Sequence, residues 1–486
     1  MSFDATPARP ATQSDSQPNP EHAREETIVA ISTPPGRGGI GIVRLSGPEA
    51  ARIAQSMARL RQPLQHAMAR FAEIYSQPSA EELALGEQPT RLDEALVTLF
   101  EPPRSYTGEL LVEIAAHGSP VVLELLVRMA LSQGARLARP GEFTERAFLS
   151  HRIDLTQAEA VRDLIDAQTL YQARIAAEQM GGALSRRVQP TKQSLIALIA
   201  LLEAGIDFAE DDIEVTPTAE ILDAMDAILS GLTALERSFT HGRLVHRGLT
   251  LALVGRPNVG KSSLFNRLVE RDRAIVTAVA GTTRDLVTER VSLGGIPVEL
   301  VDTAGLRESE DEVESLGIAK SREALAEADL VLLVVDGTTA LGEEELALAR
   351  SLVGRRALVV CNKSDLIGLE GAQAKVSNPA VGLLTVVTSA YTGEGVAELR
   401  AALLGMMESE GAGAESGLLT NLRQHEAVSA AIAALSRGRE ATLRGLPHEM
   451  ILLDLYEALA QLDSLTGQTT SEDILRHIFS TFCIGK

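Results

Sequence analysis

The stretch that decides the fold is "LTLALVGRPNVGKSS", Leu249–Ser263. An apolar strand pattern leads into Gly255, four further residues, Gly260, Lys261 and Ser262, and the helical pattern "SLFNRLVE" follows. This order of strand, glycine-rich loop and helix is the context that a P-loop requires. Glycines let backbone N–H groups turn toward phosphates, the lysine reaches the terminal phosphates, and the serine hydroxyl ligates Mg²⁺. The stretch therefore predicts a site for a nucleoside triphosphate.

Three later motifs support this prediction, and two of them identify the base. "VELVDTAG" places Asp302 at a strand end, where it can meet the Mg²⁺ shell, and Gly305 can offer its N–H to the γ-phosphate. "ALVVCNKSD" ends another buried strand with Asn362, Lys363 and Asp365. The last carboxylate can accept from both the ring N–H and the amino group of guanine, which adenine cannot satisfy. "TSA" at 388–390 supplies a backbone donor for the guanine oxygen, so we predict a GTP-binding domain.

Hydrolysis needs groups outside these motifs. "GTTRD" at 281–285 falls where a switch segment belongs, and we predict that Thr283 contacts Mg²⁺ when the γ-phosphate is bound. The residue after "DTAG" is Leu306, which cannot orient water as the glutamine of Ras-like enzymes does. Two alternatives stay open: Asn258 as ligand to a monovalent cation, and one of the acids in "LRESEDEVES".

The bulk properties limit the class of protein. The chain has 486 residues, which predicts about three domains. It has two cysteines, and no run reaches the roughly 18 apolar residues of a membrane span, so we expect a cytoplasmic protein. The formal net charge of −21 means that a nucleic acid partner would need a local basic patch or a second subunit.

The segment before the P-loop divides into three parts. Residues 1–25 read as a disordered tail, and 26–150 as a small α+β domain. Within that domain "TIVAIS", "GIGIVRLSG", "EALVTLF" and "ELLVEIAAHG" predict strands, while 48–60 and 119–131 predict helices. Gly36, Gly38 and Gly41 fit a dinucleotide-binding pattern, but a strand pattern follows, so a hairpin or ligand-binding loop is favoured.

Helical patterns fill 151–246 and return in 409–486. Gly181, Gly182 and Pro190 predict breaks in the first block. Both blocks keep apolar faces, so we predict one helical bundle built from both, with 247–408 inserted as the GTPase domain. The predicted fold class is multidomain α/β and α: an α+β amino-terminal domain, a discontinuous helical bundle and an inserted Ras-like P-loop domain.

The two cysteines receive different interpretations. Cys361 lies in a predicted core strand and is best explained by packing. Cys483 lies in the terminal "FCIGK", where Gly485 and Lys486 do not fit a prenylation box. From the residues alone, a small buried hydrophobe and a reactive thiol both remain open for Cys483.

The set "PPGRGGIGIVRLSG", "SYTGE", "RPGEFTERAFL", "GRPNVGKSS", "GTTRD", "DTAGLRE" and terminal "CIGK" resembles the MnmE (TrmE) family of tRNA-modification GTPases. The resemblance spans Glu26 to Lys486. It implies a folate-binding amino-terminal domain that forms a homodimer, and an FAD-dependent MnmG-type partner in a heterotetramer. It further implies addition of an aminomethyl or carboxymethylaminomethyl group to C5 of the wobble uridine of certain tRNAs. The one-carbon donor would be a 5-formyl- or methylene-tetrahydrofolate, with glycine or ammonium supplying the nitrogen.

The resemblance also assigns residues. It implies K⁺ bound by Asn258 with Thr277, Val279 and Thr282, Glu314 as the residue that orients water, and a functional Cys483 beside a folate site of Arg44, Glu113, Arg152 and Lys486. The family commonly has lysine at 152 and a basic residue at 391. The predicted nucleotide contacts are Asn258, Val259, Gly260, Lys261, Ser262, Ser263, Thr277, Ala278, Val279, Ala280, Gly281, Thr282, Thr283, Asp302, Thr303, Ala304, Gly305, Asn362, Lys363, Asp365, Ser389, Ala390 and Tyr391.

Two other classes of protein share part of this pattern. A ribosome-assembly GTPase of the Era or Der type has the same P-loop sequence, but it should also have a KH-like domain or a second P-loop. A scaffold that only reports its nucleotide state has no need for "CIGK". The sequence favours the tRNA-modifying enzyme.

Overall fold

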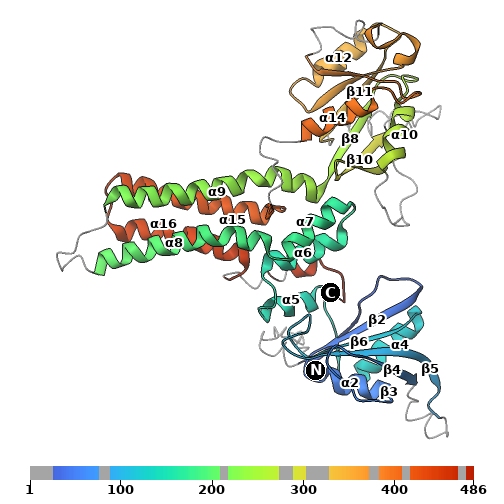
Figure 1. The fold of residues 1–486 in the computed structure, drawn as a ribbon, viewed down its shortest axis with the longest axis vertical. Helices are drawn as coiled ribbons and strands as arrows, with labels where there is room; N and C mark the ends of the chain where they lie inside the picture. The colour runs from blue at the N-terminus through green and yellow to red at the C-terminus, as the bar shows by residue number, and fades with distance from the viewer. Residues whose placement is uncertain are drawn as a thin grey trace, which may run out of the picture. The chain divides into compact units, whose positions relative to one another are not determined.

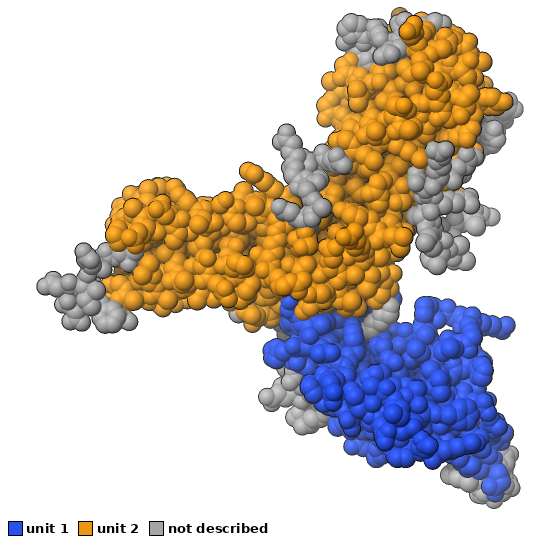
Figure 2. Space-filling view, viewed as in Figure 1, with its two compact units in different colours: residues 1–154, 470–486 blue, residues 155–469 orange. Residues whose placement is uncertain are grey.

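The computed structural model of the chain describes residues 26–75, 88–207, 217–272, 288–302, 328–371, 382–407, 416–468, 475 and 478–485. The chain forms two compact units, residues 1–154 with 470–486, and residues 155–469 (Figure 2). Each unit is described by itself.

The first unit is built on a seven-stranded sheet with the order β3-β4-β5-β6-β2-β1-β7. All of its neighbouring strands pair antiparallel except β1 and β7. The strands are β1 Ile28–Ile31, β2 Gly38–Ser46, β3 Ala58–Leu60, β4 Ala69–Tyr75, β5 Arg91–Phe100, β6 Leu111–Gly118 and β7 Arg136–Leu137. The glycine-rich segment thus opens strand β2 of a hairpin, as its sequence indicated.

Helices α2 (Ala50–Met57) and α4 (Pro120–Ser132) pack on this sheet. Their apolar residues share one core with alternate residues of the strands, such as Val43 and Leu45 of β2. The predicted helix over 48–60 ends earlier, because 58–60 pairs with β4 as strand β3. A third helix, α5 (Glu142–Leu149), contributes Phe143 to a separate small core under β1.

The end of the chain packs in this same unit. Phe479 and Phe482 are buried, and Ile484 forms a β-bridge with Pro140. The hydroxyl of Ser32 donates to the Gly485 carbonyl over 2.9 Å. Gly485 has φ +96°, and a Cβ there would lie 2.2 Å from the carbonyl oxygen of Ile31, so only glycine fits. The last residues of the predicted 409–486 segment therefore pack on the amino-terminal sheet.

The second unit contains a four-helix bundle assembled from both helical blocks of the sequence. Helices α8 (Ala183–Asp207), α9 (Thr218–Arg247), α15 (Leu422–Leu443) and α16 (His448–Thr466) lie side by side (Figure 1). Shorter helices α6 (Leu155–Asp166) and α7 (Leu170–Met180) precede them. Helix α8 runs through Pro190, where a break was predicted. Val188 and Leu195, which flank Pro190 in the helix, are buried in the bundle core, and their burial offsets the loss of the one backbone hydrogen bond that proline removes.

A partly buried ion pair joins the two helical blocks. Arg423 of α15 donates from Nε and Nη2 to both carboxylate oxygens of Glu159 on α6, over 2.6 and 2.9 Å. Gln424 donates to the same carboxylate over 2.8 Å. These residues lie 264 and 265 positions from Glu159 in the sequence, so the contact closes the bundle around the inserted segment.

The insert is a six-stranded sheet with the order β13-β12-β11-β8-β10-β9, in which only β9 pairs antiparallel. The single residue Gly248 links α9 to β8. The elements are β8 Leu249–Val254, α10 Lys261–Asp272, β9 Thr288–Leu293, β10 Ile296–Asp302, β11 Leu330–Asp336, α12 Glu343–Ser351, β12 Ala357–Asn362, the 3₁₀ turn η2 Ser364–Leu366, β13 Leu384–Val387 and α14 Val396–Met407.

Separate apolar cores cover the two faces of this sheet, one with α10 and α14 and the other with α12. Cys361 lies fully buried in the second core, and burial raises the pKa of its thiol to about 11. Its role is therefore packing, as the sequence predicted. Of the helices in the described ranges, none is long and apolar enough to cross a membrane.

Candidate functional site

The P-loop lies between strand β8 and helix α10. Asn258 adopts a left-handed backbone conformation with φ +63°. Gly260 has φ +94°, and a Cβ there would lie 2.2 Å from the side-chain amide of Asn362. The Lys261 ammonium donates to the carbonyls of Gly255 and Arg256 over 2.9 and 2.7 Å, so it lies within the turn of the loop. This arrangement suits a phosphate chain held by backbone N–H groups and one cation.

The predicted guanine residues meet at the ends of β12 and β13. Asn362 donates from Nδ2 to the Val259 carbonyl over 2.9 Å, and its Oδ1 accepts from the Ala390 N–H over 2.9 Å. The hydroxyl of Ser389 donates to Oδ1 of Asp365 over 2.6 Å. The structure therefore brings the P-loop, Asn362, Asp365 and residues 389–391 together, as the sequence motifs predicted.

One acid in this region was missed by the sequence reasoning. Asp336 ends strand β11, and its carboxylate accepts from Lys363 Nζ over 2.7 Å. Burial alone would raise the pKa of Asp336, but hydrogen bonds from Lys363 and Thr338 hold it below its usual value. The signal was present as an aspartate at the end of the apolar run "LVLLVVD", the same pattern that identified Asp302.

The switch residues lie outside the described part of the chain. These are Thr277, Ala278, Val279, Ala280, Gly281, Thr282, Thr283, Thr303, Ala304, Gly305 and the predicted catalytic Glu314. The backbone of Asp302 ends β10, whose register pairs it with Leu253 of β8 just before the P-loop. Asp302 thus ends the strand next to β8, the strand that leads into the P-loop. In the described ranges, no cluster of three metal-binding side chains occurs.

A second polar site lies on the amino-terminal sheet. Arg44 of β2 and Glu113 of β6 are cross-strand partners, and Arg44 donates from Nε and Nη2 to Glu113 Oε1 over 3.0 and 2.6 Å. The guanidinium lies 5.4 Å from the ring centre of Tyr106 and 5.6 Å from that of Phe143. Within the described ranges nothing donates to Glu113 Oε2. That oxygen can accept from a ligand N–H.

The predicted folate contact Arg152 and the predicted catalytic Cys483 belong to the same unit. Arg152 donates to the Ser105 carbonyl over 3.2 Å, and so fixes the residue before Tyr106. Cys483 is exposed, and its carbonyl accepts from the Gly141 N–H over 3.3 Å. The tail is bound beside Ser32, which directly follows the strand that pairs with Arg44. Lys486 lies outside the described residues.

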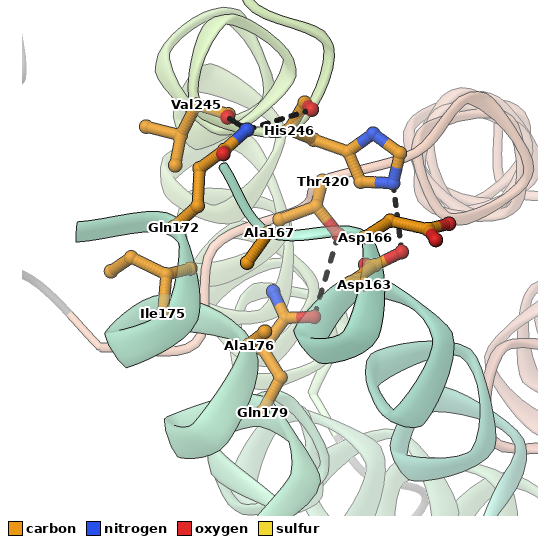
Figure 3. A pocket seen from close by; sticks show the side chains of 10 residues that line it. All are labelled: Asp163, Asp166, Ala167, Gln172, Ile175, Ala176, Gln179, Val245, His246 and Thr420. Atoms are coloured by element: carbon orange, nitrogen blue, oxygen red, sulfur yellow. Dashed lines mark hydrogen bonds and ion pairs between the residues drawn. The ribbon is translucent and has the colours of Figure 1, made fainter. Parts of the chain in front are cut away.

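A small pocket lies between α6, α7 and the end of α9 (Figure 3). Gln172, in the capping box that begins α7, donates to the Val245 and His246 carbonyls over 2.7 and 3.2 Å. His246 Nε2 lies 2.9 Å from Asp163 Oδ1, and this bond outweighs burial and raises the pKa of the imidazole. The dashed lines in Figure 3 join Gln172 to the end of α9 and His246 to Asp163 of α6, so these bonds fix the helices that lead to β8.

Family models cover most of the chain. The "GTP-binding protein TrmE N-terminus" matches residues 27–152, and the "MnmE helical domain" matches residues 155–483. A curated relative from Koribacter versatilis, named tRNA modification GTPase MnmE, is 57% identical over 95% of this chain and 99% of its own length. Relatives of the same name from Aquifex aeolicus and Pseudomonas aeruginosa are 39% and 41% identical over 95% and 96% of this chain and all of their own.

These matches bear on the alternatives left by the sequence. Both domains outside the GTPase insert match the tRNA-modification family, so a ribosome-assembly GTPase of the Era or Der type is not favoured. The identity extends across the nucleotide site, the amino-terminal sheet and the helical bundle together. The chain therefore belongs to the MnmE (TrmE) family of tRNA modification GTPases.

Proposed function

We propose that this chain hydrolyses GTP during modification of the wobble uridine of certain tRNAs. The observation that carries the proposal is the presence of two polar sites in one chain. A P-loop is joined to the proposed guanine site through Asn362, and an Arg44–Glu113 pair lies in the same unit as the bound terminal tail.

In the GTPase site, Lys261 and the backbone of the P-loop would bind the phosphates, while Asp365 selects guanine. Mg²⁺, held by Ser262 and Thr283, would neutralise charge on the β- and γ-phosphates. Glu314 would orient a water molecule for in-line attack on the γ-phosphorus, so that the bond to the bridging oxygen breaks and GDP and phosphate form. We propose that K⁺ bound through Asn258, Thr277, Val279 and Thr282 replaces an arginine finger.

In the amino-terminal site, Glu113 would accept from the ring N–H and amino group of a pterin. Arg44 fixes the orientation of this carboxylate, and its own plane is held over Tyr106 and Phe143. The proposed ligand is a 5-formyl- or methylene-tetrahydrofolate, contacted also by Arg152 and Lys486. Cys483 would act at the edge of this site as nucleophile or general acid.

The proposed assembly follows the family. It is a cytoplasmic homodimer joined through the amino-terminal domains, with an FAD-dependent MnmG-type partner in a heterotetramer and tRNA as substrate. The chain carries an excess of acidic residues, so tRNA binding through the partner is consistent with its charge.

Mass spectrometry of tRNA nucleosides tests this function. In cells that lack the protein, we expect the modified wobble uridine to disappear and the wild-type chain to restore it. The Cys483→Ser variant should keep GTPase activity and fail to restore the modification. Unchanged wobble uridines in the deletion strain would reject the proposed function, and full restoration by Cys483→Ser would reject a chemical role for that thiol.

A further inference from the structure

We propose that Arg267 positions the loop that recognises guanine; this inference rests on the proposed GTP site. Arg267 lies on α10, the helix that begins at the P-loop lysine. Its Nε donates to the Ala390 carbonyl over 2.9 Å, and its Nη2 donates to the Tyr391 carbonyl over 2.6 Å. One planar guanidinium therefore holds two successive carbonyls of the guanine loop, residues 389–392.

The first of these bonds orients a donor. In a trans peptide the carbonyl and the N–H point in opposite directions. Because the Ala390 carbonyl points to Arg267, the Tyr391 N–H of the same peptide must point away from it. Among the described residues this N–H has no acceptor, whereas the Ala390 N–H already donates to Asn362. The Tyr391 N–H is thus the donor available for the guanine oxygen.

The second bond supports the carboxylate. The Tyr391 carbonyl and the Thr392 N–H belong to one peptide group. Arg267 binds the carbonyl, and the N–H donates to Ser389 Oγ over 3.1 Å. The same hydroxyl donates to Asp365 Oδ1 over 2.6 Å. A continuous set of hydrogen bonds therefore runs from Arg267 to the carboxylate that reads the ring N–H and amino group of guanine.

A purely structural role makes a different prediction from a positioning role. If Arg267 only stabilised the fold, its loss would weaken the binding of all nucleotides by the same factor. If it aims the two recognition groups, its loss must also reduce discrimination between bases. Inosine diphosphate lacks the amino group that Asp365 binds, and 6-thioguanosine diphosphate carries a poor acceptor at the position of the guanine oxygen.

The experiment compares three variants of the full chain. Arg267→Met keeps most of the aliphatic stem and removes the donors, and Arg267→Lys keeps the charge without the fork. Arg400→Met is the matched control, because Arg400 donates over 3.2 Å to the carbonyl of Leu268, the neighbour of Arg267 on α10 and not a residue of the guanine loop. Fluorescence titration gives the Kd for GDP and for both analogues, and thermal unfolding by circular dichroism verifies the fold.

We expect Arg267→Met to weaken GDP binding about tenfold, because hydrogen bonds from a charged donor are lost. The ratios of analogue Kd to GDP Kd should both fall toward one. Arg267→Lys should recover part of each ratio, and Arg400→Met should match the wild type. Unchanged ratios in a folded Arg267→Met variant would overturn the inference, whether or not the GDP affinity falls.

Asp365→Asn separates this inference from the site on which it rests. If that variant leaves the ratio for inosine diphosphate unchanged, the guanine site itself is wrong. If it lowers the ratio while Arg267→Met does not, only the role of Arg267 fails.

Discussion

Single side chains in the nucleotide site connect segments that are far apart in the sequence. The Asn362 amide binds the P-loop through one atom and the 389–391 segment through the other. Lys363 binds Asp336, 27 positions away. Since each of these side chains joins segments that together form the nucleotide site, conservative substitutions should impair nucleotide binding.

Glu314 is the residue proposed to orient the attacking water. We expect Glu314→Ala to retain GTP affinity within about twofold and to lower turnover by about 100-fold or more, because it would remove the group proposed to orient water. Single-turnover hydrolysis and nucleotide titration measure the two effects. Glu312→Ala is the matched control in the same acidic run and should behave like the wild type. Wild-type turnover in Glu314→Ala would remove this residue from the mechanism.

At the scale of elements, the terminal tail is held mainly by backbone contacts. Its carbonyls at Cys483 and Gly485 accept hydrogen bonds from Gly141 and Ser32. The side chains of Phe479 and Phe482 fill the core beneath. Such binding depends on close approach of two backbones rather than on the identity of the exposed side chains.

Gly485→Ala tests this binding. A Cβ at Gly485 would meet the Ile31 backbone, which cannot move aside as a flexible side chain can. We expect the affinity for 5-formyl-tetrahydrofolate, measured by calorimetry, to fall at least about tenfold, with GTPase activity unchanged. Gly445→Ala introduces a side chain at a similar φ, +67°, with nothing within 4 Å, and should keep its folate affinity. Equal affinities in both variants would show that the tail does not support the folate site.

The ion pair between His246 and Asp163 predicts a pH dependence. The folded-state pKa of His246 is raised, mainly by the bond to Asp163, so its contribution to stability is full below the unfolded pKa of about 6.5. This contribution to stability is lost as pH rises through the raised pKa of His246. We expect the melting temperature of the wild type to fall more between pH 6 and pH 8 than that of Asp163→Asn, by an amount equivalent to at most about 1 kcal/mol. Identical pH profiles would contradict this prediction.

For the whole molecule, the prediction concerns the monovalent cation. We expect replacement of K⁺ by Na⁺ at constant ionic strength to slow GTP hydrolysis at least about tenfold, because the smaller ion would fit poorly in the proposed K⁺ site. Asn258→Ala should be slow in both salts and keep its GDP affinity. Phosphate release measures the rate, and equal wild-type rates in the two salts would exclude a K⁺ site at Asn258.

The sequence predicted the parts of the molecule that depend on consecutive residues. The P-loop, the strand that carries Asn362 and the β1–β2 hairpin follow from local pattern. Arg267 escaped prediction because its role arises from contacts with a segment 123 positions away. Asp336 shows the same strand-end pattern as Asp302, but its ion pair with Lys363, 27 positions away, appears only in the folded chain. The short strands β3 and β7 form because a neighbouring strand supplies their partners, and α8 continues through Pro190 because its flanks are buried. Such effects of tertiary packing leave no periodic signal in the chain.

The link at Gly248 has a mechanical consequence. Helix α9 has 30 residues, or about 45 Å of rigid rod, and one residue separates it from the strand that ends in the P-loop (Figure 1). The backbone of this link can rotate freely only about φ and ψ of Gly248. The hydrogen bonds from Gln172 to the Val245 and His246 carbonyls fix the end of α9 just before Gly248. A rotation of β8 would therefore pass directly to α9, and through α9 to the helices α8 and α15 that pack along it.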